Sequence, residues 1–238
     1  TLFTVFKSMF LDNISAVEPA RLVRAWVGGT NRMSFANFRD LEDQRAFHGW
    51  AGYTLYQANL RTADRVEKIW GQLVTGNYFD VLGVTPKLGR TFSSEEDKTQ
   101  SPVAVISESL WQRQFGADQN VVGKSLVLNG HPFTVIGVAP REFVGTEEAF
   151  PREIWIPVMM KGVLRPDPQP TNIDPLNDRR FRSFDVMARL KEDVTLSQAQ
   201  TAMNVVASRL AQNYPETNAN FRIALYACQR VGQVGRRH

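Results

Sequence analysis

The segment from Gly116 to Ser125 ends in Gly-Lys-Ser, as a phosphate-binding loop does. In such a loop four residues separate the two glycines, whereas six separate Gly116 from Gly123. The surrounding pattern predicts a helix before the segment and a strand after it. A phosphate loop needs the reverse order, because the N–H groups that hold the phosphate lie at the start of the following helix. We therefore expect a loop leading into a hairpin, and no ATP binding.

Other residue types with chemical potential are scattered. The acidic residues form three short groups: Asp40/Glu42/Asp43, Glu95/Glu96/Asp97 and Glu147/Glu148. Paired carboxylates act as acid and base when their surroundings separate their pKa values, but runs of this kind are typical of solvated helix faces and caps. The histidines, His48, His131 and His238, have no metal-ligand spacing. The sequence predicts no catalytic residues, no metal site and no cofactor.

Four aromatic residues cluster after the first predicted helix: Trp50, Tyr53, Tyr56 and Trp70. Cross-strand packing in the core explains them most simply, because a sheet in a globule of this size needs large core side chains. The alternative is an exposed hydrophobic groove for a lipid-like cargo.

Composition excludes several classes of protein. The chain has 238 residues, a net charge of +4 and 43% hydrophobic residues, which is ordinary for a folded protein. Its arginines are dispersed rather than gathered in a stripe, which argues against nucleic-acid binding. No run approaches the ~18 apolar residues of a membrane span. The single cysteine, Cys228, follows an apolar run and is interpreted as a small buried hydrophobe.

The periodicities predict alternating short elements. Strands are expected at 21–27, 49–60, 66–75, 103–106, 126–136 (a hairpin around Asn129-Gly130), 154–156, 184–190 and 221–228. Helices are expected after Ser34, Asn77, Ser107 and Thr195, with an acidic first helical turn at 95–97. Prolines at 166, 168, 170 and 175 mark a loop.

Each end of the chain supplies a strand–helix–strand unit, which predicts a discontinuous domain with a second one inserted. The class is α+β, with helices on one face of each sheet. The expected divisions are 1–19 as a membrane-proximal stalk or helix end, 20–75 plus 181–229 as one subdomain, 76–180 as an inserted small α/β subdomain, and 230–238 as a tail. We expect 184–190 to pair with the first unit and not with the 126–136 hairpin.

The chain resembles the periplasmic core domain of ABC-transporter permeases of the MacB/FtsX type. The resemblance is carried by short motifs in a specific order and spacing: Val74-Thr75-Gly76-Asn77-Tyr78-Phe79 to Val84, Leu88-Gly89-Arg90-Thr91-Phe92, Val103 to Ser107, Leu110 to Gly116, Val122-Gly123-Lys124, Asn129-Gly130 and Phe133 to Pro140.

The resemblance implies a non-enzymatic domain between two membrane helices of a permease in the cell inner membrane, facing the periplasm. It further implies a porter-like subdomain from both chain ends, a dimeric permease and a cytoplasmic ATPase subunit or domain. ATP hydrolysis would be coupled to export or to periplasmic work by mechanotransmission. Thr1–Leu11 would be the end of a membrane helix. The polar tail 229–238 predicts a piece excised or truncated from a longer permease. The alternative function is a binding module for a hydrophobic or lipidated cargo or for a periplasmic adaptor protein.

Overall fold

The computed structural model describes residues 18–28, 32–41, 44–62, 64–146, 152–164 and 174–228. Several expectations lie outside these ranges. They are the membrane-helix end at Thr1–Leu11, the carboxylates Glu42, Asp43, Glu147 and Glu148, the prolines at 166, 168 and 170, and the tail 230–238 with His238.

Strands dominate the described chain. They are β1 (Leu22–Val27), β2 (Met33–Ser34), β3 (Phe47–Arg61), β4 (Val66–Val74), β5 (Leu88–Gly89), β6 (Val103–Ile106), β7 (Ser125–Leu128), β8 (His131–Val138), β9 (Ile154–Pro157), β10 (Arg182–Leu190) and β11 (Ile223–Ala227). The α-helices are α2 (Phe35–Arg39), α3 (Tyr78–Leu82), α4 (Glu108–Phe115), α5 (Leu196–Asn213) and α6 (Pro215–Asn218), and the 3-10 turns are η1 (Pro19–Arg21) and η2 (Val158–Lys161).

Local capping explains where the helices begin. The side chains of Ser34, Ser107 and Thr195 each accept a hydrogen bond from a backbone N–H in the first turn of α2, α4 and α5. Asn77 precedes α3 but makes no side-chain cap. At its other end, α3 stops at Gly83, whose φ of 71° favours glycine. These predicted elements are therefore confirmed, with one difference in capping chemistry.

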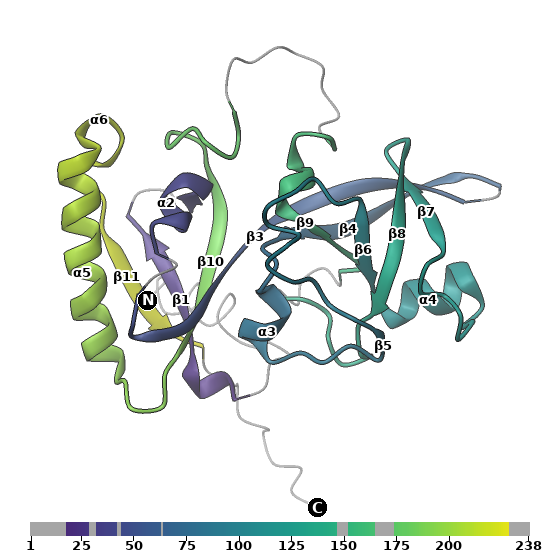
Figure 1. The fold of residues 1–238 in the computed structure, drawn as a ribbon, viewed down its shortest axis with the longest axis horizontal. Helices are drawn as coiled ribbons and strands as arrows, with labels where there is room; N and C mark the ends of the chain where they lie inside the picture. Colours follow the sequence, from purple (N-terminus) through teal and green to yellow (C-terminus); the bar gives the residue numbers. More distant parts are fainter. Residues whose placement is uncertain are drawn as a thin grey trace, which may run out of the picture.

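All the strands in the described ranges join one mixed sheet of 11 strands, whose main order is β11-β1-β10-β3-β4-β9-β6-β8-β5. Strand β10 lies antiparallel between β1 and β3, so the late part of the chain pairs with the early part as expected. The long strand β3 crosses the middle of the molecule in Figure 1 and continues into the half that contains β6, β7, β8 and α4. The fold is α+β and sheet-rich.

The helices do not all lie on one side, contrary to the sequence-based expectation. Helices α2 and α5 cover one face of the terminal strands, where Trp50 packs in the same cluster as Met203 and Leu210 of α5. Helix α3 packs in a different cluster with Ala51, the next residue on β3. Since adjacent residues of a strand point to opposite faces, α3 and α5 lie on opposite faces of this part of the sheet.

The acidic segment at 95–97 is also not helical, because residues 94–98 form a turn. Glu96 is only 5% exposed and accepts hydrogen bonds from the N–H and hydroxyl of Ser93, at 2.8 and 2.6 Å, and from Arg90 at 2.8 Å. Asp97 accepts a 2.7 Å bond from the N–H of Gly76. These two carboxylates hold a loop together rather than forming a solvated helix face.

Among the described residues, no helix combines the length and the apolar character needed to cross a bilayer.

Candidate functional site

A buried polar network lies at the centre of the molecule, around Gln72 of β4. Its Oε1 accepts hydrogen bonds from the hydroxyl of Tyr78 at 2.8 Å and from the indole N–H of Trp155 at 3.1 Å. Its Nε2 donates to the hydroxyl of Thr146 at 3.0 Å. All four residues are buried. Because an unpaired buried polar group is costly, each member depends on the others.

This network lies beside the strands of the chain ends. Arg24 of β1 donates a 2.9 Å hydrogen bond to the hydroxyl of Tyr53 on β3 and a 3.5 Å bond to the backbone carbonyl of Thr146. Thr146 is therefore bonded both to Arg24 and to Gln72. Burial raises the pKa of Tyr78 far above that of a free tyrosine, so this hydroxyl is a fixed donor and not an acid.

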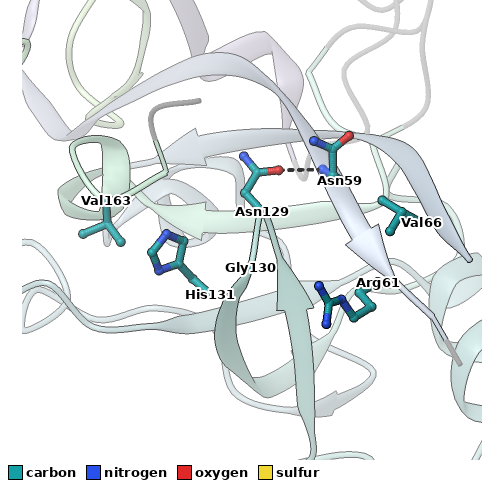
Figure 2. A pocket seen from close by; sticks show the side chains of 7 residues that line it. All are labelled: Asn59, Arg61, Val66, Asn129, Gly130, His131 and Val163. Atoms are coloured by element: carbon teal, nitrogen blue, oxygen red, sulfur yellow. Dashed lines mark hydrogen bonds between the residues drawn. The ribbon is translucent and has the colours of Figure 1, made fainter. Parts of the chain in front are cut away.

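A second polar site is a surface pocket of about 390 Å³ beside the β7–β8 turn. Figure 2 shows the residues that line it: Asn59, Arg61, Val66, Asn129, Gly130, His131 and Val163. Within the described ranges, the Arg61 guanidinium and the His131 imidazole make no hydrogen bond or ion pair. The pocket therefore presents two nitrogen-rich side chains to solvent.

Asn129 lines this pocket and is fixed in place by hydrogen bonds to β3. Asn129 has a φ of 47° and Gly130 a φ of 84°, as a tight hairpin turn requires. The side-chain oxygen of Asn129 accepts from the N–H of Asn59 at 2.8 Å, and its own N–H donates to the Asn59 carbonyl at 2.9 Å. Its amide nitrogen donates to the hydroxyl of Tyr56, whose pKa burial raises to about 12.

The four aromatic residues Trp50, Tyr53, Tyr56 and Trp70, for which the sequence left an exposed groove open as the alternative to core packing, do not come together. Trp50 and Tyr53 are each 1% exposed and belong to two different core clusters. Tyr56 packs against a third cluster, and its hydroxyl donates to the carbonyl of Leu164 at 3.1 Å. Trp70 is half-buried on β4. An exposed groove cannot include Trp50 and Tyr53, because their side chains fill the interior.

The Gly-Lys-Ser segment has the structural context that the sequence predicted. Helix α4 ends at Gly116, and β7 begins at Ser125. Lys124 forms an ion pair with Asp118 within the loop. No helix starts after the segment, so its N–H groups are not aimed at a phosphate site.

Within the described parts of the chain, no three His, Cys, Asp or Glu side chains gather closely enough to hold a metal ion. His48 lies on β3 and His131 at the start of β8. Cys228 is 2% exposed, and burial raises the pKa of its thiol to about 11, as suits a buried hydrophobe.

Sequence reasoning missed the central network. Gln72, Arg24 and Thr146 stand among ordinary strand and loop residues, and nothing local marks them as buried. One usable signal was the position of Gln72 and Arg24 inside otherwise apolar strand patterns. Polar residues at such positions are buried only where a partner from elsewhere in the fold bonds them.

Comparison with known proteins agrees with this architecture. The chain is 29% identical over 137 residues to the macrolide export ATP-binding/permease protein MacB of Aggregatibacter actinomycetemcomitans, which covers 49% of this chain and 21% of that protein. It is 26% identical over 159 residues to MacB of Chlorobium luteolum, covering 64% of this chain and 23% of that protein. The matched part is thus about a fifth of each of these relatives' length.

Solved structures share the fold. The periplasmic region of MacB from Actinobacillus actinomycetemcomitans superposes with a TM-score of 0.62 at 17% identity, covering 86% of this chain and 88% of that one. A domain of a putative permease from Porphyromonas gingivalis gives a TM-score of 0.64 at 15% identity, covering 94% and 97%. Residues 1–206 match the family described as the MacB-like periplasmic core domain. The chain therefore belongs to the MacB-like periplasmic core domain family of ABC-transporter permeases.

Proposed function

We propose that this chain is the non-enzymatic, periplasm-facing domain of an inner-membrane ABC permease, and that it couples cytoplasmic ATP hydrolysis to export by transmitting motion. Three kinds of observation support a mechanical role. First, the family is one of permease domains. Second, the central polar residues bond to one another, and third, the described acidic residues Glu96 and Asp97 are bonded within a loop.

The observation that carries the proposal is the placement of the two ends of the described chain. β1 and β11 are antiparallel neighbours, and the N–H of Cys228 donates a 2.8 Å hydrogen bond to the carbonyl of Leu22. The polypeptide therefore enters and leaves the sheet at one place, as Figure 1 shows. A domain suspended between two membrane helices needs this arrangement, because both connections must return to the membrane.

The central network supplies a route from these strands into the rest of the molecule. Arg24 lies on β1, and its partner Thr146 is bonded to Gln72 of β4. We assign the moving parts as a porter-like subdomain of 20–75 plus 181–229 and an inserted subdomain of 76–180, with 1–19 and 230–238 as the membrane-side connections. A hinge between the two subdomains is the two-state element that such coupling requires.

A disulfide between β3 and α3 tests this proposal. A Cβ at Gly49 would lie 3.1 Å from the Cγ2 atom of Val81, so Gly49→Cys with Val81→Cys places the two sulfurs within reach of each other. In the full-length permease, we expect the oxidised pair to lower transport at least about tenfold and reduction to restore it. Cys228 is buried and does not compete for the bond.

The matched control is a disulfide inside one subdomain, made by Asn59→Cys with Lys68→Cys, which are directly paired across β3 and β4. This bond should leave transport unchanged. If the Gly49–Val81 bond forms quantitatively, the fold is retained, and transport is equal in both redox states, the subdomains do not move against each other.

The partners that follow from this role are a cytoplasmic ATPase subunit or domain and a second permease copy. The alternative function, capture of a hydrophobic or lipidated cargo, is weakened by the burial of Trp50 and Tyr53. Docking of a periplasmic adaptor protein stays open as a second role. Pull-down from the full-length permease after cross-linking, with mass spectrometry, would identify either.

A further inference from the structure

Strand β3 has a break along one of its two edges. On one edge β4 pairs with it continuously, from Tyr53 opposite Val74 to Arg61 opposite Val66. On the other edge β10 pairs with it only as far as Tyr53, opposite Asp185. β7 pairs with that edge only at Leu60 and Arg61. The stretch 54–58 therefore has a neighbouring strand on one side only among the described residues.

The backbone groups at this break point outward. Both the N–H and the carbonyl of Asn59 bond to Asn129, so the main chain of Asn59 faces the broken edge. In an antiparallel pair this direction alternates, so Leu55 and Gln57 face the same way. Neither residue has a hydrogen-bond partner on that side within the described chain, and both are exposed, Leu55 to 42%. Unpaired edge groups of this kind accept an added strand.

The two flanking strands limit what fits. The pairing of β10 with β3 stops at Asp185, and the preceding residue of β10, Phe184, is opposite Met33 of β2. At the other end the Asn129-Gly130 turn contacts Asn59. The opening between Tyr53 and Asn59 is six residue steps, or about 20 Å at ~3.3 Å per residue. A short extended peptide fits such an opening, whereas the long edge of a second folded sheet does not.

The pocket beside the β7–β8 turn indicates which charge the bound peptide should carry. Asn59 ends the opening and also lines the pocket, together with Arg61 and His131. Arg61 has no ion-pair partner in the described chain, while the neighbouring Arg65 is paired with Glu67. A free guanidinium beside an amide favours a carboxylate.

We propose that the edge of β3 between Tyr53 and Asn59 binds an extended, acidic peptide segment of a partner protein by β-strand addition, with a carboxylate of the peptide at Arg61. The main-chain groups of Leu55 and Gln57 supply the hydrogen bonds. This inference goes beyond the transport role and does not depend on it, because it concerns a binding surface of the domain alone.

Amide hydrogen exchange in the free protein is the first test. Tyr56 and Ala58 are paired with β4, opposite Gly71 and Ile69, and should be protected. The amides of Leu55 and Gln57 should exchange at least about tenfold faster, giving an alternating pattern along one strand. Equal protection of all four amides would show that the edge is already covered and would overturn the proposal. Protection of Leu55 and Gln57 that appears only at high protein concentration would identify a second copy as the occupant, which also overturns it.

Peptide binding is the second test. The probe is an acetylated and amidated heptapeptide of alternating threonine and valine that ends in two aspartates, compared with the same peptide ending in two lysines. NMR titration should show slowed exchange at Leu55 and Gln57, with affinity for the aspartate peptide at least about tenfold higher. Arg61→Ala should remove that preference, and the matched control Arg65→Ala should keep it. A flat titration with the aspartate peptide, or equal binding of both peptides, would refute the proposed site.

Discussion

The hydroxyl of Tyr78 donates a 2.8 Å hydrogen bond to the side-chain oxygen of Gln72, although one residue lies in a helix and the other in the middle of the sheet. The same oxygen also accepts from Trp155 of β9. Gln72 thus joins α3, β4 and β9 through one amide group. Because Gln72 is 1% exposed, water cannot replace these bonds if the amide is removed.

Gln72→Ala should therefore be strongly destabilising. It leaves two buried donors, on Tyr78 and Trp155, without an acceptor, and we expect a loss of about 3 kcal/mol in the free energy of unfolding. Urea denaturation measures this change in the free energy of unfolding. The control is Gln57→Ala, an exposed glutamine on the adjacent strand, which should change stability by less than about 0.5 kcal/mol. Similar values for the two variants would mean that the network does not hold the core together.

Gly76→Ala tests the tight contact after β4. A Cβ at Gly76 would lie 2.1 Å from the carbonyl oxygen of Ser93, and that backbone cannot move freely because Asp97 holds the Gly76 N–H. We expect a loss of roughly 1–3 kcal/mol by overpacking. Gly162→Ala is the control, since a Cβ there meets nothing within 4 Å. Thermal unfolding should show a lower midpoint for Gly76→Ala and an unchanged midpoint for Gly162→Ala. An unchanged midpoint for Gly76→Ala would show that the backbone around Gly76 and Ser93 can accommodate a Cβ.

Glu96 should make stability depend on pH. Burial works to raise its pKa, but hydrogen bonds from Ser93 and Arg90 outweigh burial, and the pKa lies below that of an ordinary glutamate. A group with a lowered pKa in the folded state stabilises the protein above its unfolded-state pKa, and this contribution is lost as the pH falls through the folded-state value. Glu96→Gln should cost about 1–3 kcal/mol at pH 7 and progressively less below about pH 4. Paired urea titrations from pH 7 to pH 3 would measure the difference, and a constant difference would exclude this role.

The thiol of Cys228 should be inert in the folded protein. Its pKa of about 11 leaves little thiolate near neutral pH, and the side chain is almost fully covered. We expect its reaction with an aromatic disulfide reagent at pH 8 to be at least about a hundredfold slower than in 6 M guanidinium, where the pKa returns to roughly 8.5. Equal rates in the two conditions would show that the end of β11 opens readily.

The sequence alone determined most of the local elements. The caps at Ser107 and Thr195 and the Asn129-Gly130 turn depend on contacts three or fewer residues apart, so their signals are contained in short stretches of chain. The order of motifs was likewise sufficient to indicate the family. The helix start predicted at 95–97 was wrong. An acidic run favours a helix start only when its carboxylates are not bound by other groups, and here Arg90 and Ser93 donate hydrogen bonds to Glu96.

The tertiary structure decided which distant strands pair and which polar groups are buried. β10 inserts between β1 and β3, more than a hundred residues away in sequence, and this choice depends on packing across the whole sheet. The same packing buries Gln72, covers Trp50 and Tyr53, and leaves one edge of β3 open beside Arg61. A strand pattern specifies which face of a segment is apolar, but the partners that lie against its edges are set only when the complete chain folds.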